Sequence, residues 1–403
     1  MLGQPALARA LALQLQDAPL EAWRHYLRVR LLDSVADQLQ PALAQAHFDY
    51  RSGVLRGLQA PPPRVERVIA TIGGAFGNAP LGEALGELYI GTTFSTVAQT
   101  RAQQMVEDIR SAMRQRINRS PWMSQATQQQ ALAKLDAMVA QIGGPGRWQT
   151  YEGLDIRSDD YAGNTLRLRA WDTQRRLADL VLPVDRQRWN TSAHTVNAFA
   201  AQGNRIVFPA GILQPPFFDA AADDASNYGA IGSVIGHEIT HHFDDRGRQF
   251  DAVGNLRDWW QPADAAAYKA RAERVAQLYS SYEPLPGVRI NGHQMLGENI
   301  SDFGGIQMAF DALQIAVQRR RAAGLAVPLV NGQTPEQRFF LANALVWRGK
   351  IREQALINQL RTGQHSPGRY RVLGPISHMP AFAQAFGCKA GDPMVAHDPI
   401  LIW

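Results

Sequence analysis

The pentapeptide His237-Glu238-Ile239-Thr240-His241 constrains this chain more than any other feature. Two histidines four residues apart lie one turn apart on the same face of a helix, so both imidazoles can reach a single ion. A glutamate directly after the first histidine can hold a water molecule beside that ion. Two neutral nitrogen ligands, an open coordination position and a neighbouring base are what a zinc hydrolase needs. The pentapeptide therefore predicts a helix that carries a zinc site.

The residues before the pentapeptide favour that helix. Ser226 or Asn227 can cap its start. An apolar back with helical spacing follows, made by Ile231, Ile235 and Ile239. A neighbouring stripe carries the candidate ligands, with Val234, His237 and His241. The alternative is a buried helix whose two histidines only satisfy each other, and it leaves the glutamate between them unexplained.

The third protein ligand separates the subclasses of such sites. A histidine six residues past His241 or a glutamate nineteen residues past it would mark two of them, but these positions hold Gly247 and Trp260. The next candidate is Glu298, and Asp302 follows it at the same one-turn spacing. Glu298 can bind the metal while Asp302 accepts the other ring N–H of a ligand histidine. The alternative for this pair is a solvated helix start, where acidic residues are favourable.

A second helix is expected to continue from Glu298. Apolar residues keep the helical spacing after it, at Ile300, Phe303, Ile306, Phe310 and Leu313. Gly304 and Gly305 interrupt this pattern, and each costs a helix about 1 kcal/mol relative to alanine. We expect another backbone to approach closely at these two glycines.

Several further segments, in order along the chain, are shared with one known family. They are Val196–Phe199, Ile206–Asp219, Tyr228–His241, Phe243–Asp245, Gly297–Ile300, Ala344–Trp347, His365–Gly368, Tyr370–Val372 and Ile402–Trp403. A fainter likeness runs back through Trp122 and Gly86–Tyr89 to about Trp23. On these residues the sequence resembles the neprilysin and endothelin-converting-enzyme family of zinc metallopeptidases, over nearly the whole chain.

The resemblance implies roles for the residues of the metal site. One zinc ion per chain would be held by His237, His241 and Glu298. Glu238 would be the general base that takes a proton from the zinc-bound water. Asp302 would be the partner of a ligand histidine, and His365 would hydrogen-bond the oxyanion of the tetrahedral intermediate.

The resemblance also implies substrate contacts. Arg371 would hydrogen-bond to a substrate carbonyl beyond the scissile bond. Asn197 and Ala198 would form the edge segment that pairs with substrate backbone. An apolar pocket for the residue after the cut would contain Phe217, Val234 and Trp347. The implied function is a zinc-dependent endopeptidase that cleaves oligopeptides on the amino side of large apolar residues.

Three departures from the family pattern are visible. Gly363 stands where the family more often has an aspartate that could orient the histidine two residues on. Ala200 replaces an aromatic residue, and the loop to Asn204 is one residue shorter. Family enzymes are also considerably longer at the N-terminus, so the second, helical lobe is expected to be largely missing here. The alternative function is therefore a truncated, catalytically impaired zinc-binding fragment that needs this N-terminal lobe.

Composition narrows the class of protein. With 45% apolar residues over 403 positions, the chain can bury a large core. It contains no apolar run long enough for a transmembrane segment. No aromatics interleave with Arg319–Arg321, which argues against nucleic-acid binding. Cys388 is the one cysteine and cannot form an internal disulfide, as in bacterial members. The compartment is not indicated, although bacterial relatives are often periplasmic or secreted.

The expected fold is a mainly helical α+β, thermolysin-like (gluzincin) catalytic lobe with a small β-sheet edging the cleft. We assign residues 1–170 to the helical part of that lobe and 171–403 to its zinc-peptidase core. Residues 160–200 are an alternative remnant of the second lobe.

Local patterns predict elements within this fold. Two leucine-rich helical stripes are expected in the core, one with Leu7, Leu11 and Leu15, the other with Trp23, Leu27 and Leu31. Thr127 and Gln130 suggest a capping box, before a helix that runs past Val139 to Ile142 and stops at Gly143-Gly144-Pro145. The best strand prediction is Ile206–Phe208.

Overall fold

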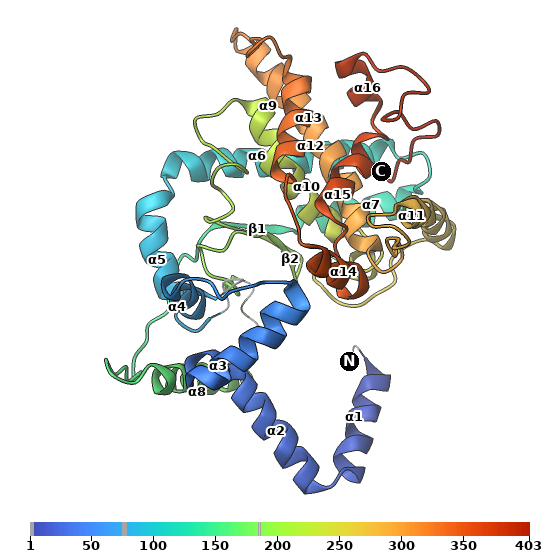
Figure 1. Cartoon of the computed structure of the whole chain (residues 1–403). Coiled ribbons are helices and arrows are strands. Elements are labelled where there is room, and N and C mark those ends of the chain that lie inside the picture. Colours follow the sequence, from blue (N-terminus) through green and yellow to red (C-terminus); the bar gives the residue numbers. More distant parts are fainter. Residues whose placement is uncertain (1–3, 75–78, 184, 186) are drawn as a thin grey trace. The chain divides into compact units, whose positions relative to one another are not determined.

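The computed structural model describes residues 4–74, 79–183, 185 and 187–403. They form two compact units: unit 1 comprises Met1–Pro62 and Tyr151–Leu182, and unit 2 comprises Pro63–Thr150 and Pro183–Trp403. The protein is mainly helical with one three-stranded sheet, as expected (Figure 1). The boundary at residue 170 and the assignment of residues 160–200 to a lobe remnant stay predictions.

Unit 1 is built from helices. They are α1 (Pro5–Asp17), α2 (Leu20–Val35), α3 (Pro41–Phe48) and α8 (Tyr161–Asp179), with a 3-10 turn at Ala36–Gln38 and a π-helical turn at Asp49–Val54. Helices were predicted here, but the prediction that their leucines are core is wrong. Leu15 is 66% exposed and Leu27 is 59% exposed, and α1 buries no residue. The spacing of apolar residues predicts a helix, but burial also requires another element that packs against the apolar face. Within the described part of the chain, no element covers these leucines.

Unit 2 contains the remaining helices. They are α4 (Arg64–Gly73), α5 (Gly82–Thr93), α6 (Thr96–Arg119), α7 (Gln125–Asp136), α9 (Asp224–Asn227), α10 (Ser233–His241), α11 (Pro262–Ser281), α12 (Leu296–Ala322), α13 (Pro335–Val346), α14 (Glu353–Thr362), α15 (Gly368–Ile376) and α16 (Pro380–Phe386). The long helix α12 packs against α10, α6, α11 and α15. Its predicted apolar stripe is buried, with Phe310 partly covered. None of the helices in the described ranges could span a membrane.

The sheet of unit 2 has the order β1-β3-β2. Strand β1 (Val139–Gly143) runs parallel to β3 (Arg205–Pro209), and β2 (Phe199–Ala201) pairs antiparallel with β3. The predicted strand Ile206–Phe208 is confirmed as the middle of β3. Strand β2 pairs with β3 alone in this sheet, so one side of β2 is an edge.

The helix predicted to run to Ile142 is shorter than expected. Helix α7 ends at Asp136, and Ile142 lies in β1 opposite Phe208. Strand pairing takes over because the β-branched Val139 and Ile142 fit a pleated surface and β3 supplies the hydrogen-bond partners. The predicted cap is also wrong: Ser124, not Thr127, caps α7 by accepting from the Thr127 amide.

The helical stretch that leads to the pentapeptide begins earlier than predicted. Asp223 caps α9 through the Ala225 amide, so the predicted caps Ser226 and Asn227 lie inside the helix. The helical backbone continues through a π-helical turn, Tyr228–Gly232, into α10. The predicted apolar back is confirmed, because all three of its isoleucines are at most 1% exposed.

Candidate metal centre and active site

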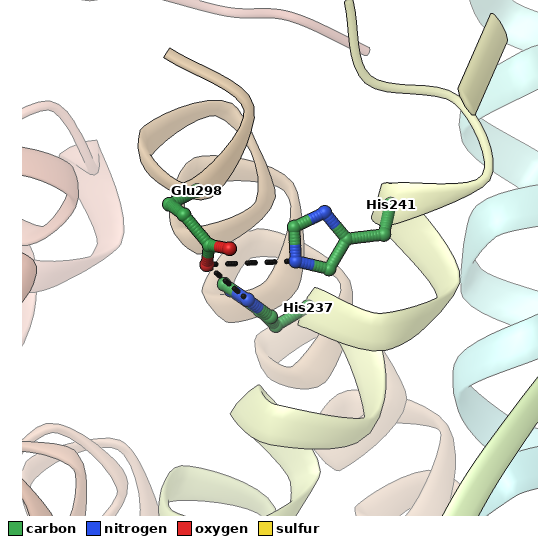
Figure 2. Close-up of side chains that lie close together, drawn as sticks. All are labelled: His237, His241 and Glu298. Atoms are coloured by element: carbon green, nitrogen blue, oxygen red, sulfur yellow. Dashed lines mark ion pairs between the residues drawn. The ribbon is translucent and has the colours of Figure 1, made fainter. Parts of the chain in front are cut away.

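Helix α10 presents the two predicted imidazole ligands on one side. The rings of His237 and His241 lie edge to face, with centroids 4.5 Å apart. His237 is 6% exposed and His241 is partly buried. The one-turn spacing therefore places both imidazoles on the same side of α10, as predicted, and brings one nitrogen of each ring toward a common point (Figure 2).

Glu298 completes this group from the first turn of α12. Its Oε2 lies 3.2 Å from His237 Nε2 and 3.5 Å from His241 Nε2 (Figure 2). One ligand atom from each of the three residues lies within 4.8 Å of the others. The prediction that Glu298 joins the two histidines is thus matched by the geometry.

The donor set fits a zinc ion. It offers two imidazole nitrogens and one carboxylate oxygen, which is a common set for zinc with an open fourth position. Among the described residues, the buried Oε2 of Glu298 has no hydrogen-bond partner despite the facing imidazoles. Burial opposes ionisation of Glu298, but the three imidazoles around it outweigh burial and hold its pKa far below the ordinary range. An ionised oxygen that faces three ring nitrogens at 3.1–3.5 Å suits a shared cation.

Asp302 lies one turn beyond Glu298 and contacts His237, as predicted. Its Oδ1 is 2.9 Å from His237 Nδ1. Arg371 binds the same carboxylate through both oxygens, at 2.8 and 2.7 Å. Burial opposes ionisation of Asp302, but the Arg371 guanidinium and His237 lower the pKa of this carboxyl. Asp302 therefore accepts from His237 Nδ1 and leaves Nε2 free to bind a metal.

His241 has a carboxylate partner that the sequence analysis did not single out. Asp244 Oδ2 lies 2.7 Å from His241 Nδ1, and the Ser301 hydroxyl is 3.0 Å from the same nitrogen. Asp244 Oδ1 accepts from the amides of Arg246 and Gly247. The sequence feature that could have identified Asp244 is its position, three residues after a candidate ligand histidine and just beyond the end of α10.

Glu238 is 6% exposed and follows the candidate metal ligand His237 directly in α10. Burial opposes protonation of His241, but Asp244, Glu298 and Glu238 outweigh it and raise the pKa of this imidazole well above its usual value. Glu238 is therefore near enough to His241 to act on it electrostatically, and its role as general base stays a prediction.

His365 reaches the same carboxylate from the segment between α14 and α15. Its Nε2 is 3.1 Å from Glu298 Oε2, and its side chain is 56% exposed. The Gln359 amide donates to the His365 carbonyl, which holds the backbone. A β-carbon at Gly363 would lie 2.6 Å from the Gln359 carbonyl oxygen, so the aspartate common in the family does not fit this backbone.

The predicted substrate residues differ in how closely the structure ties them to this centre. Arg371 is 9% exposed, stacks 3.9 Å over Trp347 and approaches His237 Nδ1 at 3.4 Å. Phe217 and Val234 are partly buried and pack against the core. A common apolar pocket for the three apolar residues stays a prediction.

Asn197 and Ala198 directly precede the edge strand β2. Asn197 is exposed, and Ala198 is 6% exposed. Within the described ranges no strand pairs with the other side of β2 in this sheet, and an edge of this kind is where an extended peptide could add as a further strand. The pairing of Asn197 and Ala198 with substrate backbone stays a prediction.

Comparison with known proteins gives consistent results. Two models of peptidase family M13 match residues 197–399 and residues 1–145. An endothelin-converting enzyme homolog from Locusta migratoria is 36% identical over 334 residues, which is 81% of this chain and 46% of the relative. Neprilysin-2 from Drosophila melanogaster is 39% identical over 334 residues, which is 80% of this chain and 43% of the relative.

Solved structures show the same likeness. The Mycobacterium tuberculosis zinc metalloprotease Zmp1, in complex with an inhibitor, has a TM-score of 0.89 and 37% identity, with 98% of this chain and 59% of that chain covered. PepO from Lactobacillus rhamnosis has a TM-score of 0.81 and 31% identity, with 93% and 56% covered. The chain spans about half the length of the curated relatives it matches. On its family models, its fold and the convergence of the two histidines with Glu298, the chain belongs to peptidase family M13.

Proposed function

We propose that this protein is a zinc-dependent endopeptidase that cleaves oligopeptides on the amino side of large apolar residues. The observation that carries the proposal is the meeting of His237, His241 and Glu298 within 4.8 Å, with Glu238 buried beside them. Membership of family M13 supports the reaction class. The zinc metalloprotease Zmp1, whose structure this chain matches over 98% of its length, supports zinc as the metal.

The three converging residues would hold the metal through two Nε2 atoms and a carboxylate oxygen. A zinc ion there would supply Lewis-acid chemistry, which polarises a carbonyl and acidifies water. Asp302 and Asp244 each accept at the Nδ1 of one histidine, so both rings direct Nε2 to the centre.

Glu238 is the proposed general base. Its carboxylate accepts a proton from the attacking water and later delivers it to the leaving amine.

His365 is the proposed donor to the oxyanion. Its Nε2 already faces the metal-site carboxylate at 3.1 Å, and its exposed ring can turn toward a bound peptide. One such donor contributes about 2.7–4 kcal/mol of barrier lowering.

Arg371 and the β2 edge would orient the peptide. The guanidinium uses Nε and one terminal nitrogen on Asp302, which leaves its other terminal nitrogen to donate to a substrate carbonyl. Trp347 beneath it, with Phe217 and Val234, would favour a large apolar side chain after the scissile bond.

The test uses the purified chain, its zinc content and a mixed peptide library analysed by mass spectrometry. We expect one zinc per chain and cuts before large apolar residues. Glu238→Gln should keep zinc and lose cleavage, while the exposed Glu107→Gln should keep both. A chain that binds zinc but cleaves no peptide would be a binding module or an impaired fragment. Cuts before charged residues would contradict the pocket assignment.

A further inference from the structure

Lys134 of α7 is 1% exposed, and the metal centre as described does not use it. Lysines are almost never fully buried unless their ammonium is satisfied, because its desolvation is costly. Such a residue therefore needs a reason in the surrounding structure.

The surroundings of Lys134 consist of backbone carbonyls. Its Nζ donates to the carbonyl oxygens of His242, Gly247 and Phe250, at 2.6, 2.7 and 2.6 Å. These three bonds match the three protons of an ammonium. The rings of Phe243 and Trp259 lie 5.4 and 5.8 Å from Nζ, which adds a favourable cation–π contribution.

The three carbonyls belong to the segment 242–250, which begins directly after the candidate ligand His241. This segment folds back on the end of α10 so tightly that a β-carbon on Gly247 would lie 1.8 Å from the His241 carbonyl oxygen. Its first carbonyl, that of His242, lies at the helix C-terminus, where a cation is favourable.

The same segment carries the carboxylate that orients His241. The Gly247 amide donates to Asp244 Oδ1 at 2.7 Å, and Asp244 Oδ2 lies 2.7 Å from His241 Nδ1. Continuous hydrogen bonds thus lead from Lys134 through Gly247 and Asp244 to the imidazole.

We infer that Lys134 is a positioning residue for the metal ligand His241, acting through the segment 242–250 and Asp244. Without its ammonium, the buried His242 carbonyl loses its donor, whereas the carbonyls of Gly247 and Phe250 keep only the Phe250 amide and the Trp259 indole N–H. The segment then moves to satisfy the His242 carbonyl elsewhere. Asp244 then no longer holds the His241 ring in the orientation that binds metal. This inference rests on the metal site of the proposed function.

The decisive measurement is zinc affinity, because a merely structural lysine would change stability alone. Zinc dissociation constants are measured by competition with a chromophoric chelator, at a temperature where circular dichroism shows the variant fully folded. We expect Lys134→Met to weaken zinc binding on the order of tenfold, the lower end of the range for partners of ligand histidines.

The matched control is Asp264→Asn. Asp264 is also buried and also holds α7, through Ser124 and Thr127, but it has no bond to the segment 242–250. It should destabilise the fold and leave the zinc dissociation constant unchanged.

A double-mutant cycle tests the route through Asp244. Lys134→Met should have no further effect on zinc binding in an Asp244→Asn background. An unchanged zinc dissociation constant in Lys134→Met, or an equal loss of zinc affinity in both backgrounds, would overturn this inference but not the proposed metal site. A wild-type chain that takes up no zinc would overturn the proposed metal site and the inference with it. If Lys134→Met fails to fold, Lys134→Gln, which keeps a donor for one carbonyl, takes its place with the same expectations.

Discussion

Gly236 of α10 and Gly305 of α12 face each other where the two helices that carry the candidate metal ligands touch. A β-carbon on Gly236 would lie 2.5 Å from the Gly305 carbonyl oxygen, and one on Gly305 would lie 2.6 Å from the His237 amide nitrogen. The backbones can approach this closely only without side chains there. Because Glu298 lies seven residues, about two turns, before Gly305, this contact also sets its reach to His237.

Gly305→Ala should separate α10 from α12. Overpacking of this kind typically costs about 1–3 kcal/mol, and the longer distance from Glu298 to the histidines should weaken zinc binding. Chemical denaturation and chelator competition measure the two effects. The control is Gly91→Ala in α5, where a β-carbon meets nothing within 4 Å and should stabilise the helix slightly. If Gly305→Ala changed stability and zinc binding as little as Gly91→Ala, the close contact would not set the distance between the two helices.

The convergence of the candidate metal ligands was largely predictable from the sequence because helical spacing is a local property. One-turn intervals in His237–His241 and Glu298–Asp302 fix which side chains share a face whatever the tertiary structure. The close approach at Gly305 was also predictable, since glycine inside a helix needs a reason. Asp244 was not singled out, because its contact with His241 depends on how the segment after α10 folds back.

The sequence predictions were wrong where contacts with distant parts of the chain decide the local structure or the burial of a residue. Val139 and Ile142 fit a helical stripe equally well, and only the pairing with β3 makes them a strand. Leu15 and Leu27 do form helical stripes, but spacing cannot show whether another layer covers them. The α7 cap moved from Thr127 to Ser124 because Asp264 of α11 receives hydrogen bonds from both residues.

Arg371→Ala should destabilise the protein as well as weaken substrate binding. The substitution leaves the buried carboxylate of Asp302 without its cation, which typically costs about 3–5 kcal/mol. Denaturant unfolding of the zinc-free protein measures this loss. The exposed pair of Arg24 and Glu21 offers the control, since Arg24→Ala should change stability by about 0.5 kcal/mol or less. Similar small effects in both variants would contradict the buried ion pair.

Removal of the metal should lower the melting temperature. A ligand that binds only the folded state stabilises it by about 4 kcal/mol when its free concentration is a thousandfold above Kd. Calorimetry with added zinc and with chelator should therefore give well separated transitions. His241→Ala should abolish the separation, whereas His293→Ala, an exposed histidine paired with Glu273, should preserve it. If the melting temperatures with zinc and with chelator still differed in His241→Ala, zinc would bind at another site.

Asp264 should contribute to acid unfolding. Burial raises its pKa, but hydrogen bonds from Ser124 and Thr127 outweigh burial and lower the pKa below the ordinary value. A carboxyl with a lowered folded-state pKa stabilises the fold above its unfolded-state pKa, near 4, and this contribution is lost as the pH falls through the folded-state pKa. The stability difference between the wild type and Asp264→Asn should therefore be constant above about pH 5 and shrink in more acidic solution. A difference that does not change down to the acid transition would contradict this.

His365→Ala should separate catalysis from metal binding. The side chain is 56% exposed and is not among the three converging ligands, so its loss should leave both zinc content and melting temperature unchanged. If its Nε2 donates to the oxyanion, the contribution exists only in the transition state, and kcat should fall by about 10²–10³ with little change in KM. Steady-state cleavage of a short peptide measures both constants, with the exposed His397→Ala as the control. Zinc loss that parallels the loss of kcat would instead make His365 a metal ligand, and an unchanged kcat would remove it from the reaction.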